Sequence, residues 1–233
     1  MVDNKALIVA LDFDDLDNVL RLTDRLDPSI CRLKVGKQLF TRTGPMAVER
    51  LVDRGFDVFL DLKFHDIPNT VANAVSAAAD LGVWMINVHA VGGSSMMKAA
   101  HEALAGRQNK PLLTAVTVLT SMAEADLAEV GFQGPALSRV VELAKLTERA
   151  GLDGVVCSAR EAVELRKVVD PAFILVTPGI RLKGDSVGDQ KRVVEPAAAI
   201  AAGADYLVVG RSITTAADPV RVIKRILSSL EPG

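Results

Sequence analysis

The stretch Arg54-Gly-Phe-Asp-Val-Phe-Leu-Asp-Leu-Lys63 decides how this chain is expected to fold. Its glycine follows a helix-like stretch, as a C-cap glycine does, and the apolar run Val58–Leu60 has the character of a buried strand. Two charged residues, Asp61 and Lys63, follow where that strand leaves the core. Residues two apart on a strand share a face, so this carboxylate and this ammonium are expected to lie side by side.

The same lead-in returns as Ala150-Gly-Leu-Asp153 and Ala202-Gly-Ala-Asp205. Short apolar runs also recur along the whole chain, with helix-like stretches between them. The runs are Ala6–Asp12, Cys31–Gly36, Asp57–Lys63, Met85–Ala90, Leu112–Leu119, Gly154–Ala159, Phe173–Gly179 and Tyr206–Arg211. Eight strand–helix units predict an α/β protein with a single (β/α)8 TIM barrel.

A doubly wound open sheet is the alternative fold. It would need a glycine-rich dinucleotide turn after the first strand, and Ala10–Asp14 contains no glycine. No linker, charge block or low-complexity segment divides the chain. Residues 1–233 are therefore expected to form one catalytic domain.

Composition excludes several classes of function. The 233 residues carry a net charge of −2, which gives no general attraction to nucleic acid or to an anionic membrane surface. No apolar stretch approaches the length of a membrane span, and the start of the chain lacks a secretory signal. Cys31 and Cys157 lie in apolar runs and are interpreted as reduced residues of a cytoplasmic protein. Two cysteines and three histidines match no zinc spacing, so no metal is predicted.

In a barrel of this kind the active site forms at the carboxyl ends of the strands. Two lysines and two carboxylates near the ends of strands two and three, Lys34, Lys63, Asp61 and Asp66, could form an alternating array. Such an array would keep both lysines protonated and both carboxylates ionised. The alternative interpretation of Asp61 and Lys63 is a surface ion pair at a strand end. The further polar residues in the next turn favour a functional site.

The end of the eighth strand suits a phosphate. Gly210 lets backbone N–H groups approach an anion, and Arg211 can bind it bidentately at the usual phosphate corner of a barrel. A surface arginine is the other interpretation. The long charged loop at about residues 180–194 is interpreted as a mobile lid that brings Gln190 to a ligand, with an unstructured surface loop as the alternative.

Taken together, these residues resemble the orotidine 5′-phosphate decarboxylase family. The resemblance runs from Leu11-Asp12 to Gly210-Arg211, nearly the whole chain. The motifs that carry it are Asp61-x-Lys-x-x-Asp66 followed by Ile-Pro-Asn-Thr70, Lys34-Val-Gly36, Thr117–Ser121, Pro178-Gly-Ile-Arg181 and Gly210-Arg211.

The resemblance implies a homodimer that converts orotidine 5′-phosphate to uridine 5′-phosphate and CO2, the last step of de novo UMP synthesis, without metal or organic cofactor. It implies that Lys63 protonates C6, that Asp61 lies beside the substrate carboxylate, and that Lys34 and Asp66 hold Lys63 in place. Asp66 and Thr70 would enter the partner's site. The remaining contacts would be Asp12 and Lys34 with the ribose, Thr120 and Ser121 with the pyrimidine, and Arg181, Gln190, Gly210 and Arg211 with the phosphate.

Two other functions stay open at this stage. A sugar-phosphate decarboxylase or synthase of the same suprafamily shares Asp-x-Lys-x-x-Asp but resembles metal enzymes, with a glutamate on strand two. Here that strand carries Lys34, whose charge would repel Mg²⁺. A barrel that binds a phosphate ligand without turnover is the second, because a fold alone does not give a function.

Overall fold

The computed structural model describes residues 5–182 and 194–230 and closes the strands β1 to β8 into one barrel, in chain order. Every neighbouring pair is parallel. The strands are β1 (Leu7–Ala10), β2 (Arg32–Gly36), β3 (Val58–Phe64), β4 (Met85–His89), β5 (Leu112–Val116), β6 (Gly154–Val156), β7 (Ile174–Thr177) and β8 (Tyr206–Val209). The prediction of a single (β/α)8 barrel is confirmed.

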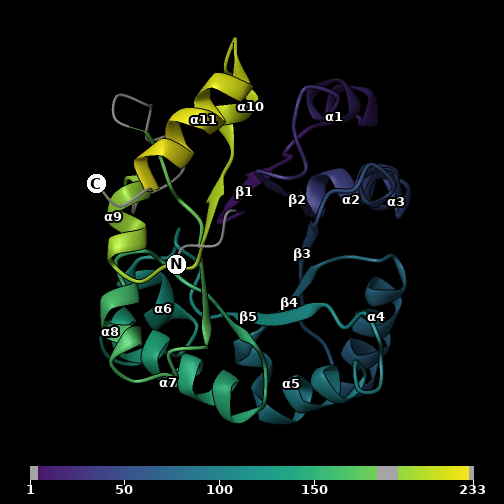
Figure 1. Ribbon diagram of the computed structural model, residues 1–233. Coiled ribbons are helices and arrows are strands. Elements are labelled where there is room, and N and C mark those ends of the chain that lie inside the picture. The colour runs from purple at the N-terminus through teal and green to yellow at the C-terminus, as the bar shows by residue number, and fades with distance from the viewer. Residues whose placement is uncertain (1–4, 183–193, 231–233) are drawn as a thin grey trace.

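Helices surround the strands as a ring (Figure 1). They are α1 (Leu16–Thr23), α2 (Lys37–Thr43), α3 (Met46–Asp53), α4 (Pro68–Asp80), the short 3-10 helix η1 (Ala90–Gly92), α5 (Gly93–Glu102), α6 (Glu124–Glu129), α7 (Ala136–Arg149), α8 (Ala162–Arg166), α9 (Pro196–Ala201), α10 (Arg211–Thr214) and α11 (Pro219–Leu230). None of the helices in the described ranges has the length and hydropathy that crossing a membrane requires.

The repeated Gly-x-Asp lead-in connects a helix to the next strand. Gly55, Gly151 and Gly203 follow α3, α7 and α9 with φ of 81°, 85° and 105°, the left-handed region expected after a helix C-cap. The aspartate two residues later binds the backbone of a neighbouring strand. Asp153 accepts the N–H of Leu113 and Asp205 accepts the N–H of Leu175, each at 2.7 Å. The lead-in therefore ends one helix and fixes the start of a strand pair.

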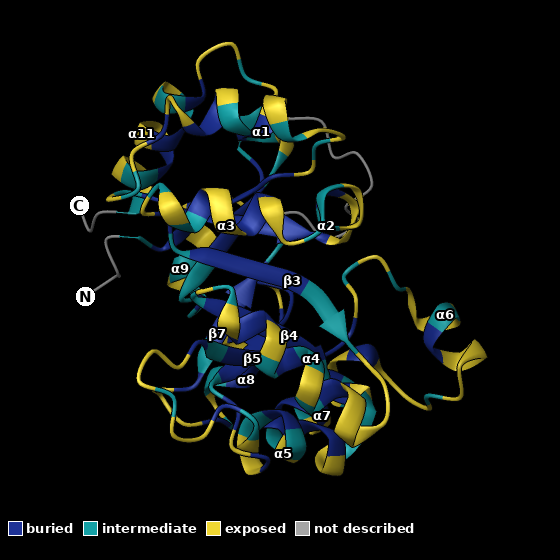
Figure 2. Cartoon of the chain, turned by 90° about the vertical axis from the view of Figure 1, so that its right-hand side faces the viewer, coloured by how far each residue is buried: buried dark blue, intermediate teal, exposed yellow. Residues whose placement is uncertain are grey.

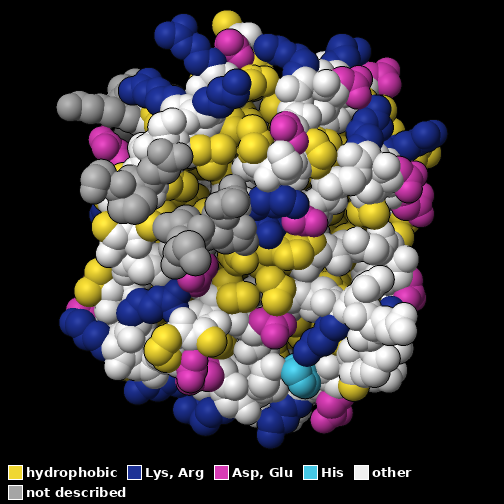
Figure 3. All heavy atoms as spheres, in the orientation of Figure 1, with side chains coloured by type: hydrophobic (Ala, Val, Ile, Leu, Met, Phe, Trp, Pro, Cys, Tyr) yellow, Lys and Arg dark blue, Asp and Glu magenta, His cyan; other side chains and the backbone are white. Residues whose placement is uncertain are grey.

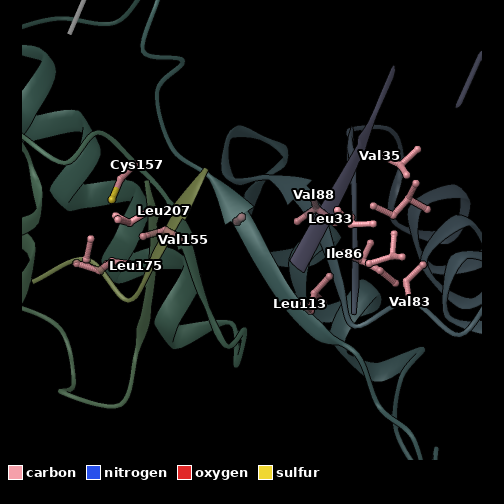
Figure 4. Close-up of a cluster of buried hydrophobic side chains, with 14 of the residues drawn as sticks. Leu33, Val35, Val83, Ile86, Val88, Leu113, Val155, Cys157, Leu175 and Leu207 are labelled. Carbon is pink, nitrogen blue, oxygen red and sulfur yellow. The ribbon is translucent and has the colours of Figure 1, made fainter. Parts of the chain in front are cut away.

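Side chains alternate between two cores along each strand. On β1, Ile8 and Ala10 belong to a cluster made of strand residues alone, which fills the barrel interior. Leu7 and Val9 belong to a larger cluster shared with the helices. Figure 4 shows side chains of this larger cluster from several strands, among them Cys157. The period of two leaves one face of every strand for the barrel interior, where the functional side chains lie.

Both cysteines are buried and form no disulfide, as the sequence predicts. Burial raises the pKa of the Cys31 thiol to about 12, with a further contribution from Asp27. Both thiols are therefore neutral core groups at physiological pH.

A cation–π stack lies at the amino end of the barrel. The guanidinium of Arg32, the first residue of β2, lies 4.1 Å from the centre of the Trp84 ring and 5.1 Å from that of Tyr206. The two rings meet edge to face, with 5.0 Å between their centroids. Asp57 pairs with the same guanidinium at 3.2 Å. The two rings and Asp57 thus give the buried guanidinium of Arg32 its partners. The stack lies at the amino ends of the strands, opposite to their carboxyl ends.

Candidate active site

A cavity of about 570 Å³ lies at the carboxyl ends of the strands. Its volume is in the range of pockets that hold a small ligand. It is lined by Ala10, Asp12, Lys34, Gln38, Phe59, Asp61, Lys63, Val116, Val118, Leu119, Thr120, Ser121, Val156, Cys157, Pro178, Gly179, Arg181, Val208, Gly210 and Arg211. In the view of Figure 1, hydrophobic side chains gather over the middle of the molecule, with basic and acidic side chains beside them (Figure 3). The cavity lining thus combines apolar side chains of the barrel interior with charged ones.

Lysines and carboxylates alternate across one wall of the cavity. The Lys63 ammonium lies 2.5 Å from Oδ1 of Asp61, and the Lys34 ammonium lies 3.3 Å from Oδ2 of the same carboxylate. Lys34 also lies 3.5 Å from Oδ1 of Asp12. Lys34, Asp61 and Lys63 of the predicted alternating array therefore meet within one chain, and Asp12, which follows β1, adds a carboxylate beside Lys34. The place of Asp66 in the array stays a prediction.

The central carboxylate of the array is ionised. Burial alone would raise the pKa of Asp61, but Lys34 and Lys63, together with hydrogen bonds from Lys63 and Asn87, hold that pKa below its ordinary value. The negative charge of Asp61 thus lies inside the cavity between two positive charges. Burying a carboxylate without such partners would cost several kcal/mol of folding free energy.

The end of β3 is irregular at this point. From Leu60 to Phe64 the strand advances four residues, while its partner β4 advances two, from Ile86 to Val88. Lys63 has φ of 54° and is the only non-glycine residue with positive φ in the part of the chain that the structure describes. Figure 2 shows the strand passing from buried residues at its start to part-exposed ones here. Backbone strain of this kind is characteristic of functional sites.

Gly36 leaves the space that Lys34 occupies. A Cβ atom at this position would lie 3.0 Å from the Lys34 ammonium and 3.5 Å from Oδ1 of Asp12. The first distance is tighter than ordinary contact, so a side chain here would press on the array. The closeness of the Lys34 ammonium therefore explains why the Lys34-Val-Gly36 motif ends in glycine.

Three of the residues predicted to hold a phosphate, Arg181, Gly210 and Arg211, also line the cavity. Arg181 is buried and donates to the carbonyl of Ile180 at 2.9 Å. Gly210 precedes α10, and Arg211 begins it. The long loop is tied at its ends, where Ile180 pairs with Val194 and the Arg181 N–H donates to the Val194 carbonyl at 3.1 Å. Gln190 and most of the predicted lid lie outside the described residues, so both stay predictions.

Two predicted site residues lie apart from this cavity in the single chain. Asp66 and Thr70 are exposed, and Asp66 accepts the N–H of Ile67 at 2.6 Å. Pro68 begins α4. Neither residue is among those that line the cavity.

Sequence reasoning missed Asn87. This β4 residue is fully buried, accepts the Lys63 N–H at 2.8 Å through Oδ1, and donates through Nδ2 to Oδ1 of Asp61 at 2.7 Å. An amide inside the apolar run Met85–Ala90 was the signal that could have found it, because a buried polar side chain needs partners.

Comparisons with known proteins agree with this geometry. Residues 5–226 match the family model described as "Orotidine 5′-phosphate decarboxylase / HUMPS family". The chain is 58% identical to orotidine 5′-phosphate decarboxylase of Shewanella sediminis over the whole of both chains. It is 60% identical to the protein of that name from Chromobacterium violaceum, over 94% of this chain and 89% of the relative.

A solved structure gives the same result for the fold. The crystal structure of orotidine 5′-phosphate decarboxylase from Lactobacillus acidophilus superposes with a TM-score of 0.87 at 38% identity, covering 99% of this chain and 100% of the other. The match of sequence and fold extends over the cavity and nearly the whole barrel. The chain therefore belongs to the orotidine 5′-phosphate decarboxylase / HUMPS family.

Proposed function

We propose that this chain removes CO2 from orotidine 5′-phosphate to give uridine 5′-phosphate, a step of pyrimidine biosynthesis. The observation that carries the proposal is the array of Lys34, Asp61 and Lys63 in the wall of a cavity that also holds arginines. Such a cavity can bind a doubly charged phosphate at one side and face a substrate carboxylate with Asp61 and Lys63 at the other. The names of the full-length relatives support the same reaction.

The array suits a reaction that loses a carboxylate. With the substrate carboxylate next to Asp61, two like charges raise the free energy of the bound substrate relative to a transition state in which that carboxylate is leaving. The Lys63 ammonium stabilises the negative charge that develops at C6 and then donates its proton there. The contact of 2.5 Å between the Lys63 ammonium and Oδ1 of Asp61 holds the proton donor in place.

A direct assay tests the function. We expect the absorbance of orotidine 5′-phosphate to fall when the protein is added, and uridine 5′-phosphate to appear in equal amount. A barrel that only binds phosphate ligands would bind the nucleotide and leave that absorbance unchanged.

We also propose that the reaction needs no metal, since Lys34 and Lys63 supply positive charge beside Asp61 and would repel a divalent cation. Activity is expected to survive exhaustive treatment with EDTA at its full value, measured by the same absorbance change. A loss of activity that Mg²⁺ restores would instead favour a metal-dependent sugar-phosphate enzyme of the suprafamily.

Arg211 is proposed to bind the substrate phosphate together with Arg181 and Gly210. Replacing Arg211 with alanine should lower kcat/KM by about 10³-fold, or about 4 kcal/mol of transition-state stabilisation, because binding energy far from C6 contributes to catalysis. Steady-state kinetics measure this, and Arg225→Ala on the exposed side of α11 is the matched control. Free phosphite, added with a substrate that lacks the phosphate, should activate the unsubstituted enzyme more than the variant. Equal activation of both would remove Arg211 from the site.

The enzyme is proposed to work as a homodimer in which Asp66 and Thr70 reach the partner's cavity. A second pocket of about 320 Å³ next to this turn supports the proposal. It is lined by His65, His89, Val91, Thr117, Val118, Leu119, Met122, Leu127, Val130 and Phe132. His65 stacks on His89 with 5.7 Å between ring centroids, which places the turn that carries Asp66 beside this pocket.

Exposed apolar side chains near this second pocket also support the proposed homodimer. Val130 is 62% exposed in the pocket lining, and Ile67, the neighbour of Asp66, is 66% exposed. Exposed apolar groups of this kind mark interaction surfaces, and in a two-fold dimer the same surface of a second copy of the chain covers them. A cytoplasmic location is proposed as well, since both cysteines are free.

A further inference from the structure

Asn87 holds two parts of β3 that the array depends on. It lies on β4 in the barrel interior, is fully buried, and is not among the residues that line the cavity. Its carbonyl oxygen accepts the backbone N–H of Lys63 at 2.8 Å, and its amino group donates to Oδ1 of Asp61 at 2.7 Å. One neutral side chain thus contacts both the backbone and the carboxylate of the reacting segment.

The irregular end of β3 explains why such a side chain is needed. Two extra residues on β3 shift its register against β4 between Leu60 and Phe64, and Lys63 takes a left-handed conformation there. A bulge of this kind interrupts the ladder of backbone hydrogen bonds and re-aims a side chain. The Asn87 oxygen takes the place of a strand carbonyl as the acceptor for the Lys63 N–H.

The same amide also fixes the other end of Lys63. Oδ1 of Asp61 accepts the Lys63 ammonium at 2.5 Å and the Asn87 amino group at 2.7 Å. The position of the ammonium therefore depends on a carboxylate that Asn87 orients. We infer that Asn87 is a positioning residue for decarboxylation, aiming Lys63 through its backbone N–H and through Asp61. This inference rests on the proposed function.

Two substitutions separate positioning from simple packing. Asn87→Leu keeps the branching at Cγ and removes both hydrogen bonds, so we expect kcat to fall about 100-fold while KM stays within about threefold, because the proposed phosphate contacts are unchanged. Thr114→Val is the matched control: Thr114 is a fully buried polar residue of β5 that pairs with Asn87 across the sheet and does not contact the array. Its kcat is expected to stay within about twofold.

Asn87→Asp gives a readout that packing would not change. The new carboxylate can accept the Lys63 N–H but faces Asp61 with a like charge, so the pair binds a shared proton as pH falls. With that proton the new group donates to Asp61 again and restores the charge of the original pair. We therefore expect the ratio of kcat in this variant to that of the unsubstituted enzyme to rise as pH decreases from 8 to 5.

The other ionisable groups near Asp61 and position 87 could also change their charge with pH, so they determine the pH range in which the carboxyl pair can be followed. Lys34 and Lys63 face Asp61, and His89 lies two residues after Asn87 on β4. Burial, with the positive charges of His65, Lys63 and Lys37, lowers the pKa of His89 to about 4. The histidine thus stays neutral across the range, and the ratio reports the carboxyl pair.

Turnover by the unsubstituted enzyme tests the proposed function. The role of Asn87 is tested separately, by comparing kcat of each variant with kcat of the unsubstituted enzyme. A kcat for Asn87→Leu within threefold of normal, or an equal loss in Thr114→Val, would overturn the inference. If circular dichroism shows that Asn87→Leu does not fold, the pH series on Asn87→Asp decides alone. A ratio that stays flat from pH 8 to 5 would then show that Asn87 only fills the barrel.

Discussion

Replacing Lys63 with alanine is expected to lower kcat by about four orders of magnitude or more while the barrel stays folded. The side chain is proposed to serve as proton donor and as the positive charge nearest to C6, and each role contributes factors of about 10² to 10⁴. The loss should be larger in kcat than in KM, because the substitution leaves the proposed phosphate-binding residues, Arg181, Gly210 and Arg211, in place. Single-turnover kinetics with saturating orotidine 5′-phosphate measure the chemical step directly.

The matched control is Lys224→Ala, which removes the same side chain from an exposed position on α11. It should leave kcat unchanged. Loss of the Lys63 ammonium also leaves Asp61 with Lys34 as its one remaining lysine, so some loss of stability is expected and is measured separately by denaturant unfolding. A decrease of only about tenfold in kcat would show that another group donates the proton.

Mixing Lys63→Ala and Asp66→Ala chains is expected to restore activity that neither homodimer has. If Asp66 serves the partner's site, one site of each heterodimer carries both substitutions and the other carries none. Random exchange of equal amounts makes half of the dimers heterodimers, so about a quarter of normal activity should appear. The measurement is turnover after exchange, with the proportion of heterodimers determined from mass-tagged chains.

The control mixture is Lys63→Ala with an Asp61→Ala chain. Both of these substitutions affect the same chain's array, so no intact site forms and activity should stay at the level of the parents. Heterodimers of Lys63→Ala and Asp66→Ala that stay equally inactive would show that Asp66 acts within its own chain. A fully active Asp66→Ala homodimer would remove the residue from the site altogether.

The fold could be predicted well because it depends on a signal that is local in sequence. Each strand is a short apolar run, and the Gly-x-Asp lead-in marks the end of a helix by a backbone conformation that glycine adopts easily. Strand ends were less accurate: the run Leu112–Leu119 contains β5 only as far as Val116. The last apolar residues of that run, Val118 and Leu119, line the cavity without belonging to the strand.

Parts of the site could not be predicted because they depend on contacts between strands. The spacing of Asp61 and Lys63 predicts that they share a face, and they form an ion pair. Nothing in that spacing indicates that Lys63 takes a left-handed conformation, since the bulge is defined by the register against β4. The ion pair of Asp12 with Lys34 was not predicted either, because it depends on the register that sets Ala10 of β1 beside Lys34 of β2.

The stack of Arg32, Trp84 and Tyr206 has a practical consequence for experiments. The chain has one tryptophan and one tyrosine, and both lie in this stack at the amino ends of β4 and β8. Intrinsic fluorescence therefore originates at the end of the barrel opposite to the cavity. Unfolding separates the two rings from Arg32 and exposes them to water, so the emission reports whether the barrel is folded. Fluorescence and nucleotide absorbance, read in one cuvette, thus separate an unfolded variant from a folded but inactive one.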